Sequence, residues 1–393
     1  MIITLILPKA PAYSETFFRS KIEGLQESGH QVILVTAQSS EKFDGCKHLY
    51  HPRVNQNKLL QSLNMLINYL SLLPYLRNIV QYCKLERKDG VSIKRILEKI
   101  YLNSTLLKLK CDWIHFGFAT MGVDRETVGR AIGAKTAVSL RGYDIDVYPL
   151  DKEGVYKKLW CNLDKVHSIS NYLINKAEGM GLPFDKPKQI ITPAVNVESL
   201  PNCSKMETTA GQKLQLMTIA RLHWIKGIDD LISAATLLKS ANVDFEWSIV
   251  GDGDKKHQER YKFKVYEEEL QGHVKFLGKC SHQQTLKALC ESSIYVQTSL
   301  SEGFCNAVLE AQALGKLCIV TYGGALSENI LDGKTGWIVP RLNPESLFRK
   351  IVEIDALDLQ VKEQFSQNAK ERVRVAYGIA KQKREFNRFY AES

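Results

Sequence analysis

The sequence has 393 residues, 44% of them apolar and 24% charged, and these average proportions exclude a fibrous or wholly disordered protein. No run of about eighteen apolar residues occurs, so no segment is predicted to span a membrane. The net charge of +10 lies mostly between Arg53 and Lys110, where 11 lysines and arginines accompany 3 acidic residues.

Short apolar runs alternate with amphipathic stretches along the chain, which is typical of parallel sheets covered by helices, so the predicted class is α/β. Since domains average roughly 150 residues, two domains are expected. In the first half, the predicted strands are residues 2–7, 31–36, 113–115, 136–140, 166–170 and 189–191.

The first strand, residues 2–7, lacks the basic flank and the length of a secretion signal, and Pro8 ends it. A cytoplasmic protein is therefore expected. The nine cysteines are odd in number and include no C-x-x-C pair, which favours buried free thiols in a reducing compartment.

The basic stretch follows the second strand, and its apolar residues at spacings of three and four predict amphipathic helices. One interpretation is an ordinary solvated helix face. The other is a docking surface for anionic lipid or a phosphate-bearing acceptor. The basic residues assigned to such docking are Lys84, Arg87, Lys88, Lys94 and Arg95. Nucleic acid is not an expected partner, because no nucleic-acid-binding motif accompanies the charge.

Residues 197–213 are polar and without periodicity, which predicts a domain boundary. The predicted limits are a first domain over 1–200, a linker over 201–213, a second domain over 214–372 and a C-terminal helix over 373–393 that packs back on the first domain. The second half repeats the alternation, with strands predicted at residues 214–219, 245–250, 274–276, 294–297, 317–320 and 337–339.

Arg221 and Lys226 follow the strand 214–219, at a turn into a helix. Ligands of parallel α/β sheets bind beyond the carboxyl ends of the strands. Two cations beside a helix N-terminus at that edge favour a diphosphate site. Two solvated surface cations are the alternative.

Glu302 lies in the loop after the strand 294–297, and Glu310 lies in the helix that begins near Asn306. Carboxylates there can accept hydrogen bonds from vicinal hydroxyls, whereas a lone glutamate is also favoured by the helix dipole alone. Gly323 and Gly324 follow the next strand and would let the backbone approach a phosphate or sugar closely.

Five segments of the second half occur in a fixed order: ARLHWIKG, IVGDGD, SEGFCNAVLEAQALG, GGALSE and DGKTGWIVP. Together they resemble the donor-domain motifs of the retaining glycosyltransferase family 4, which has the GT-B fold. In the first half, YSETFFRSKIEGLQESGHQVILVT, WIHFGF and SLRGYDIDVYP resemble more loosely the members that build capsule, exopolysaccharide or lipopolysaccharide. The chain departs at Ala220 and Cys305, where many members have glycine, and at Arg141, where histidine is common.

The resemblance implies two Rossmann-like parallel-sheet domains facing a central cleft, with C-terminal helices. The first domain would bind the acceptor and the second the nucleotide sugar. Catalytic roles are implied for Arg221 and Lys226 on the donor diphosphate, and for Glu302 and His115 against the transferred sugar. A satisfied core histidine is the alternative for His115.

Glu310 is implied to bind the ribose hydroxyls. The other implied donor-binding residues are Gly251, Gly303, Phe304, Cys305, Asn306, Gly323 and Gly324. The acceptor-side residues are Ser14, Glu15, Arg141 and Asp144. No metal ligand is assigned, because the D-x-D pattern of Asp144 and Asp146 lies within a matched segment of a fold that needs no metal.

The function implied is retaining transfer of a sugar from a UDP- or GDP-sugar to a glycan or polyprenyl-diphosphate-linked acceptor, in bacterial-type surface polysaccharide synthesis. No cofactor or metal is expected, and the site of action is the cytoplasm or the inner face of the membrane. The alternatives are a GT-B-shaped nucleotide-sugar epimerase or phosphorylase, and a catalytically silent sugar-binding protein.

Overall fold

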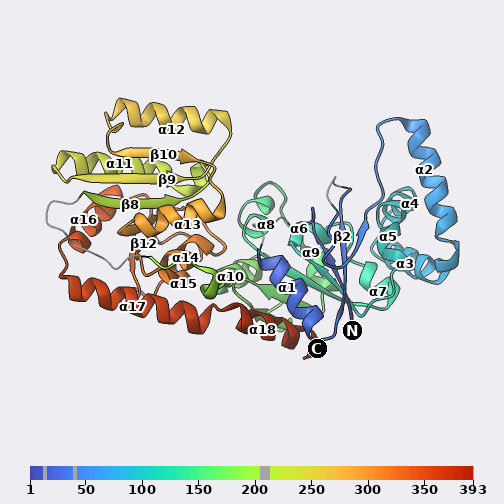
Figure 1. The fold of residues 1–393 in the computed structure, drawn as a ribbon. Helices are drawn as coiled ribbons and strands as arrows, with labels where there is room; N and C mark the ends of the chain where they lie inside the picture. The colour runs from blue at the N-terminus through green and yellow to red at the C-terminus, as the bar shows by residue number, and fades with distance from the viewer. Residues whose placement is uncertain (12–15, 39–41, 204–212, 393) are drawn as a thin grey trace. The chain divides into compact units, whose positions relative to one another are not determined.

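The structure is a computed structural model that describes residues 1–11, 16–38, 42–203 and 213–392. The chain divides into two compact units, each with a parallel sheet and covering helices (Figure 1). Unit 1 comprises Met1–Ile191 and Gln382–Ser393, and unit 2 comprises Thr192–Lys381. The predicted α/β class with two parallel sheets is confirmed.

Among the described residues, the sheet of unit 1 is seven-stranded, in the order β3-β2-β1-β4-β5-β6-β7, and neighbouring strands run parallel. All residues of β4 and β6 are buried, as expected for inner parallel strands covered on both faces. The strands are β1 (Ile2–Ile6), β2 (Gln31–Thr36), β3 (Lys47–Tyr50), β4 (Trp113–Phe116), β5 (Lys135–Leu140), β6 (Lys165–Ser168) and β7 (Lys188–Ile190).

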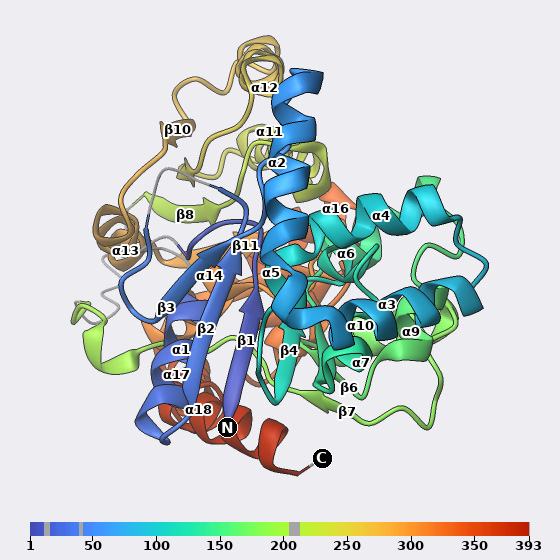
Figure 2. The same ribbon diagram turned by 90° about the vertical axis from the view of Figure 1, so that its right-hand side faces the viewer.

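The helices of unit 1 include several that follow β3 before the chain returns to the sheet. Figure 1 shows α2 at the edge of the unit, and Figures 1 and 2 both show it beside α4. The helices and 3-10 turns are α1 (Thr16–Glu27), α2 (Lys58–Ser71), η1 (Leu73–Tyr75), α3 (Leu76–Lys88), α4 (Ile93–Leu102), α5 (Ser104–Leu107), α6 (Ala119–Gly122), α7 (Val128–Ile132), α8 (Tyr143–Asp146), η2 (Tyr148–Asp151), α9 (Lys157–Asn162), α10 (Asn171–Gly179) and most of α18 (Ile379–Ala391).

The last helix, α18, belongs to unit 1 although almost two hundred residues of unit 2 precede it. Its residues Phe386, Phe389 and Tyr390 are buried. The ammonium group of Lys165, at the start of β6, donates hydrogen bonds to the carbonyl oxygens of Phe389 and Glu392, both at 2.8 Å. The chain end is therefore held by both apolar packing and charge-assisted hydrogen bonds.

The sheet of unit 2 is six-stranded within the described residues, in the order β10-β9-β8-β11-β12-β13, and again parallel. Its strands are β8 (Leu214–Ile219), β9 (Phe245–Val250), β10 (Val274–Gly278), β11 (Ile294–Gln297), β12 (Leu317–Thr321) and β13 (Trp337–Val339). Its helices and turns are η3 (Val197–Ser199), η4 (Trp224–Lys226), α11 (Ile228–Ser240), α12 (Lys255–Glu267), α13 (His282–Glu291), α14 (Asn306–Ala313), α15 (Leu326–Asn329), α16 (Pro344–Asp355) and α17 (Leu359–Ala376).

Helices cover both faces of the unit 2 sheet, and the core is correspondingly split into two clusters. Ile249 of β9 packs in the cluster that includes Leu231 of α11 and Ile351 of α16. Its neighbour Val250 packs in the cluster that includes Val308 of α14. Successive side chains of a strand point to opposite faces, so each inner strand contributes apolar residues to both clusters.

Strand β3 was missed by the sequence analysis, because its residues, KHLY, are half polar and none of them is buried. It pairs with β2 at the edge of the sheet, where one side of a strand stays open to solvent. The predicted linker over 201–213 falls largely on residues 204–212, which lie outside the described residues, and the predicted domain limits stay predictions.

The expectation that all cysteines are free is wrong for one pair. Cys203 and Cys290 form a disulfide across 87 positions of sequence, with their Cα atoms 5.0 Å apart. The bond ties the segment after η3 to α13. The other seven cysteines, all among the described residues, are free. Spacing along the chain gave no sign of this pairing, because the fold alone brings the two positions together.

Candidate functional site

A cavity of about 380 Å³ lies in unit 2 at the carboxyl ends of β8, β9 and β11. Its size falls in the range of small-molecule sites, and its place agrees with the edge at which parallel sheets bind ligands. The lining residues are Ile219, Ala220, Arg221, Lys226, Val250, Gly251, Lys279, Cys280, Thr285, Glu302, Phe304, Cys305 and Asn306. The structure thus brings seven of the predicted donor-site residues together.

Glycines shape the cavity wall by letting loops approach each other. Gly251 follows β9 with φ +139°, and a Cβ atom there would lie 2.0 Å from the carbonyl oxygen of Ala220. Gly227, with φ +64°, precedes α11 and would clash in the same way with the carbonyl oxygen of Thr298. Only glycine adopts such conformations without strain, so these contacts fix where Arg221 and Lys226 stand.

Lys226 and Glu302 form an ion pair beside the cavity, and both side chains are largely buried, at 15% and 13% exposed. Glu302 also accepts a hydrogen bond from the Ser299 hydroxyl at 2.8 Å. Arg221 is exposed on the same cavity wall, and Lys279 adds a third cation. The lining therefore has an excess of positive charge, which suits a ligand that carries at least two negative charges.

The N-terminus of α14 opens onto the same cavity through Cys305 and Asn306. The N-cap residue Cys305 makes no side-chain capping hydrogen bond. The first backbone N–H groups of a helix lack partners inside the helix and, together with the helix dipole, attract anions.

Glu310, one helical turn further along α14, is paired with His282 at the start of α13, with 2.9 Å between Nε2 and Oε1. The hydrogen bond to Glu310 raises the pKa of His282 above its usual 6.5. Sequence reasoning did not single out His282, because its partner lies 28 residues away and only the packing of α13 beside α14 joins them.

We expect His282→Gln to remove a pH-dependent contribution to the stability of unit 2. Since the folded-state pKa is raised, the ion pair contributes fully below about pH 6.5 and is lost as the pH rises through the folded-state pKa. The thermal midpoint of the wild type should therefore exceed that of the variant more at about pH 5.5 than at about pH 8.5. An equal difference at both pH values would contradict the pairing. The imidazole is 53% exposed, so the effect is small.

Gly323 and Gly324 approach the chain's own backbone closely, and their contact with a phosphate or sugar stays a prediction. A Cβ atom on Gly323 would lie 2.0 Å from the carbonyl oxygen of Ser299, and one on Gly324 would lie 2.5 Å from that of Glu302. The backbone N–H of Ala325 donates to the Glu302 carbonyl at 2.7 Å. These glycines let the turn after β12 press against the loop that carries Glu302 and Gly303, so their contribution to the site is to position that loop.

His115 lies in unit 1 near the carboxyl end of β4 and is buried. Its Nδ1 atom bonds the Tyr390 hydroxyl at 2.7 Å, its Nε2 atom bonds the Ser139 hydroxyl at 2.8 Å, and the Lys21 ammonium lies 3.3 Å from both nitrogens. Burial, followed by the charge of Lys21, lowers the pKa of His115 well below its usual range. These contacts agree with the alternative of a satisfied core histidine, and its contact with a donor sugar stays a prediction.

Asp144 is a structural carboxylate. It is buried and accepts hydrogen bonds from the backbone N–H groups of Ala119, Arg141 and Gly142 at 2.9 to 3.1 Å, while burial raises its pKa. Asp146 accepts from Lys176 at 2.6 Å and from the hydroxyl of Tyr172 at 2.9 Å.

The Arg141 guanidinium stacks 4.0 Å from the ring centre of Phe17, a favourable cation–π geometry. Arg141 and the two aspartates thus hold the loop after β5 in place. The other predicted acceptor-side residues, Ser14 and Glu15, lie outside the described residues.

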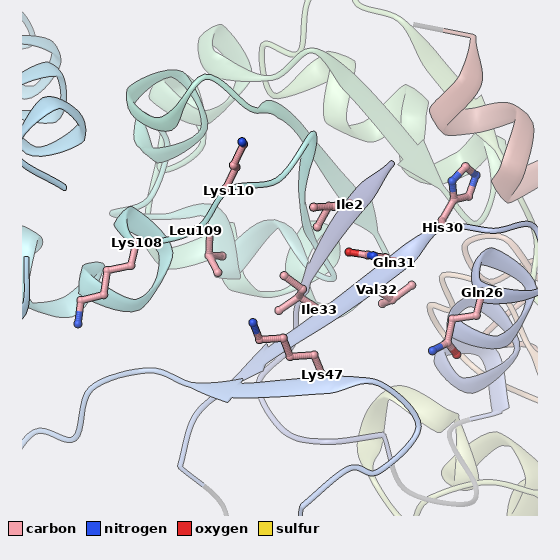
Figure 3. Close-up of a pocket in the computed structure, with 10 residues that line it drawn as sticks. All are labelled: Ile2, Gln26, His30, Gln31, Val32, Ile33, Lys47, Lys108, Leu109 and Lys110. Carbon is pink, nitrogen blue, oxygen red and sulfur yellow. The ribbon is translucent and has the colours of Figure 1, made fainter. Parts of the chain in front are cut away.

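A second cavity, of about 570 Å³, lies in unit 1 at the amino ends of β1, β2 and β3 (Figure 3). Lys47, Lys108 and Lys110 line it, and the figure shows Lys108 and Lys110 extending away from each other. The Lys108 ammonium is engaged by the Ser71 hydroxyl at 2.6 Å. Because the lysines do not converge and the cavity lies at the edge opposite to that expected for ligands, no site is assigned to it.

The family described as glycosyl transferases group 1 matches residues 204–372. Over 95% of both proteins, the chain is 24% identical to the putative colanic acid biosynthesis glycosyltransferase WcaL of Salmonella typhimurium. It is 26% identical to the amylovoran biosynthesis glycosyltransferase AmsK of Erwinia amylovora, over 60% of this chain and 58% of that protein. The crystal structure of Anabaena HepE in complex with UDP and glucose is similar with a TM-score of 0.72 at 13% identity, covering 100% of this chain and 99% of that one.

Proposed function

From the match of residues 204–372 to the group 1 glycosyltransferases and from the GT-B fold, we propose that this protein is a retaining glycosyltransferase. It moves a sugar from a nucleoside-diphosphate-sugar to a glycan or polyprenyl-diphosphate-linked acceptor during polysaccharide synthesis. The observation that carries the proposal is the cavity at the carboxyl ends of β8, β9 and β11, in which cations, a carboxylate and a helix N-terminus meet.

The donor occupies this cavity as a UDP- or GDP-sugar, with its diphosphate against Arg221, Lys226 and the first N–H groups of α14. HepE, which shares the fold, is named for a complex with UDP and glucose. Glu310 accepts hydrogen bonds from the ribose hydroxyls. WcaL and AmsK are named for colanic acid and amylovoran biosynthesis, which supports a polysaccharide as the destination of the sugar.

Binding of the diphosphate changes the partners of the Lys226–Glu302 pair. The diphosphate supplies Lys226 with a more strongly charged partner, and the Glu302 carboxylate is then available to a hydroxyl of the transferred sugar. Ser299 keeps Glu302 oriented during this exchange through its 2.8 Å hydrogen bond. The pair thus keeps the site free of an unpaired buried charge when no donor is bound.

In the reaction, the bond between the anomeric carbon and the leaving phosphate oxygen breaks and leaves an oxocarbenium-like sugar. The acceptor oxygen bonds the anomeric carbon on the face that the leaving group vacates, and its proton passes to the leaving phosphate oxygen. This route retains the anomeric configuration. The protein contributes mainly positioning and stabilisation of the charge that develops on the diphosphate.

A labelled-donor assay with a panel of UDP-, GDP- and ADP-sugars tests the proposal. Label transferred to an acceptor glycan, with the anomeric configuration of the donor seen by NMR, supports it. Donor converted to an epimer without an acceptor would instead indicate an epimerase, and sugar 1-phosphate formed from a glycan and phosphate would indicate a phosphorylase. Binding of a donor without turnover would indicate a silent sugar-binding protein.

We expect turnover to survive removal of divalent metal. Arg221, Lys226 and the α14 N-terminus stand where a metal-dependent enzyme places carboxylates that hold Mg²⁺ or Mn²⁺ on the diphosphate. The rate after dialysis against EDTA should therefore equal the rate with added Mn²⁺. Activity that is abolished by EDTA and restored only by the metal would contradict this account, and would direct attention to Asp144 and Asp146.

The proposal includes contact with the inner face of an anionic membrane through the basic residues of α3 and α4. Lys84, Arg87, Lys88 and Lys94 are exposed there. Arg95 is different, since it forms ion pairs with Glu98 at 3.1 Å and Asp124 at 2.8 Å. Contact with the membrane would bring the enzyme to a lipid-linked acceptor.

A further inference from the structure

Helix α2 of unit 1 is amphipathic, but its apolar face is exposed to solvent, whereas a globular protein usually buries such a face. At roughly 100° per residue, its leucines and isoleucine fall within an arc of about 120°. These residues are 48% exposed at the least, for Leu60, and 84% at the most, for Leu59. The apolar face consists of Leu59, Leu60, Leu63, Leu66, Ile67 and Leu70. No residue of this helix is buried, although all of it is described.

The opposite, mostly polar face of α2 lies against the protein. The Gln61 side-chain oxygen accepts the backbone N–H of Asn55 at 2.8 Å, and the Asn68 side-chain oxygen accepts the Ser104 hydroxyl at 3.3 Å. The Tyr69 hydroxyl donates to the carbonyl oxygen of Leu97 in α4 at 3.0 Å. Hydrogen bonds therefore orient the helix so that its apolar face points outward.

The other helices between β3 and β4 form a layer with α2, and they do bury side chains. Beneath it, the buried Glu86 of α3 pairs with Lys99 of α4 at 2.7 Å and with Lys158 of α9 at 3.0 Å. The elements that follow α2 in the chain also expose apolar side chains, namely Leu73, Leu76, Val80, Ile93 and Leu97. Because helices in proteins are stabilised mainly by burial of an apolar face, an outward apolar face of this extent marks a surface that another phase or molecule covers.

The charges around the face indicate what covers it. The acidic residues of this layer are all engaged: Glu86 with the two lysines above, Asp89 with Lys158 at 2.8 Å, and Glu98 with Arg95. By contrast, the other exposed cations form no ion pair with any of the described residues. These cations are Arg53, Lys58, Arg77, Lys84, Arg87, Lys88 and Lys94. An exposed apolar face in a layer whose other exposed cations are not ion-paired matches a bilayer with acyl chains below anionic headgroups.

We propose that the apolar face of α2 inserts into the boundary between headgroups and acyl chains of an anionic bilayer, with the surrounding lysines and arginines at the lipid phosphates. This inference deepens the membrane contact of the proposed function and rests on it in that respect. In this proposal, insertion of the apolar face of α2 supplies much of the free energy of membrane binding. The charges of α3 and α4 alone would give only weak binding that salt abolishes.

The test is co-sedimentation with vesicles of phosphatidylcholine, with and without phosphatidylglycerol. The variant Leu63→Gln/Leu66→Gln/Leu70→Gln keeps the charge of the protein and replaces side chains that are already exposed, so folding is expected to be unaffected. Its binding to the anionic vesicles should fall at least about tenfold, since three inserted leucines lose their contact with acyl chains. The control is Leu150→Gln/Phe184→Gln, which changes two even more exposed apolar residues of unit 1 and should bind as the wild type does.

A second variant, Lys84→Glu/Arg87→Glu/Lys88→Glu/Lys94→Glu, should also lose binding, and the wild type should bind weakly to vesicles of phosphatidylcholine alone. Unchanged vesicle binding by the triple Gln variant would overturn the proposal. So would a wild-type dimer in sedimentation velocity that the triple Gln variant converts to a monomer, because a second copy would then cover the face. Vesicle binding needs neither donor nor acceptor, so absence of sugar transfer in the donor panel would leave this result standing.

Discussion

Arg221→Ala and Lys226→Ala are each expected to lower turnover by about 100-fold or more while the protein stays folded. Both side chains line the cavity at the carboxyl ends of β8, β9 and β11, and removal of one preorganised group that stabilises developing charge typically has an effect of about this size. Arg221 is exposed on the cavity wall, so its loss leaves no cavity in a core. Steady-state rates with the donor chosen from the panel measure the effect.

The two variants should differ in one respect. Lys226→Ala leaves the largely buried Glu302 without its ion-pair partner, so it should also lower the thermal midpoint in the absence of donor, and Lys226→Ala/Glu302→Gln should restore that midpoint but not the rate. The matched control is Lys262→Ala, which removes an exposed lysine of α12 that does not line the cavity. Near-normal rates for both single variants would refute the donor-site assignment.

Gly323→Ala should both destabilise unit 2 and lower turnover. The new methyl group would lie 2.0 Å from the carbonyl oxygen of Ser299, which is backbone and has to shift. Overpacking of this kind typically costs about 1–3 kcal/mol. The displaced segment continues directly into Glu302, and a misplacement of about 1 Å at a catalytic site can lower the rate about 100-fold.

Thermal midpoints and rates should be measured together with those of Gly272→Ala. At Gly272 an added Cβ atom meets nothing within 4 Å and φ lies outside the left-handed region, so the change should be nearly neutral. If Gly323→Ala keeps both the midpoint and the rate of the wild type, the turn after β12 does not position the Glu302 loop.

The sequence was most informative where burial on both faces of a sheet leaves a continuous apolar run. The strands β2, β8, β9, β11 and β13 have the predicted limits. The edge strand β3 was not predicted, because a strand with no buried residue shows no such run. Likewise, the polar residues that follow β8 and β11 could be grouped from the sequence, since parallel strands deliver their carboxyl ends to one edge.

Contacts between distant segments could not be predicted in this way. The Cys203–Cys290 disulfide and the His282–Glu310 pair depend on how α13 packs, which no local pattern encodes. For Gly323 and Gly324 the sequence indicated a need for close approach, but it could not show their contacts with the chain's own backbone at Ser299 and Glu302. In α2 the period of the apolar residues identified the helix, whereas its outward orientation depends on hydrogen bonds made by Gln61 and Asn68.

The place of α18 has a consequence for the order of events on the ribosome. Residues 192–381 form unit 2 and are synthesised as one uninterrupted segment, so this unit can complete its core while the chain is still growing. Unit 1 begins first but lacks Phe386, Phe389 and Tyr390 until α18 emerges from the exit tunnel. Until then the polar cluster around His115 lacks the Tyr390 hydroxyl, and Lys165 lacks the carbonyl oxygens that it bonds in the finished protein. The half of the enzyme that is translated first is therefore the half that matures last.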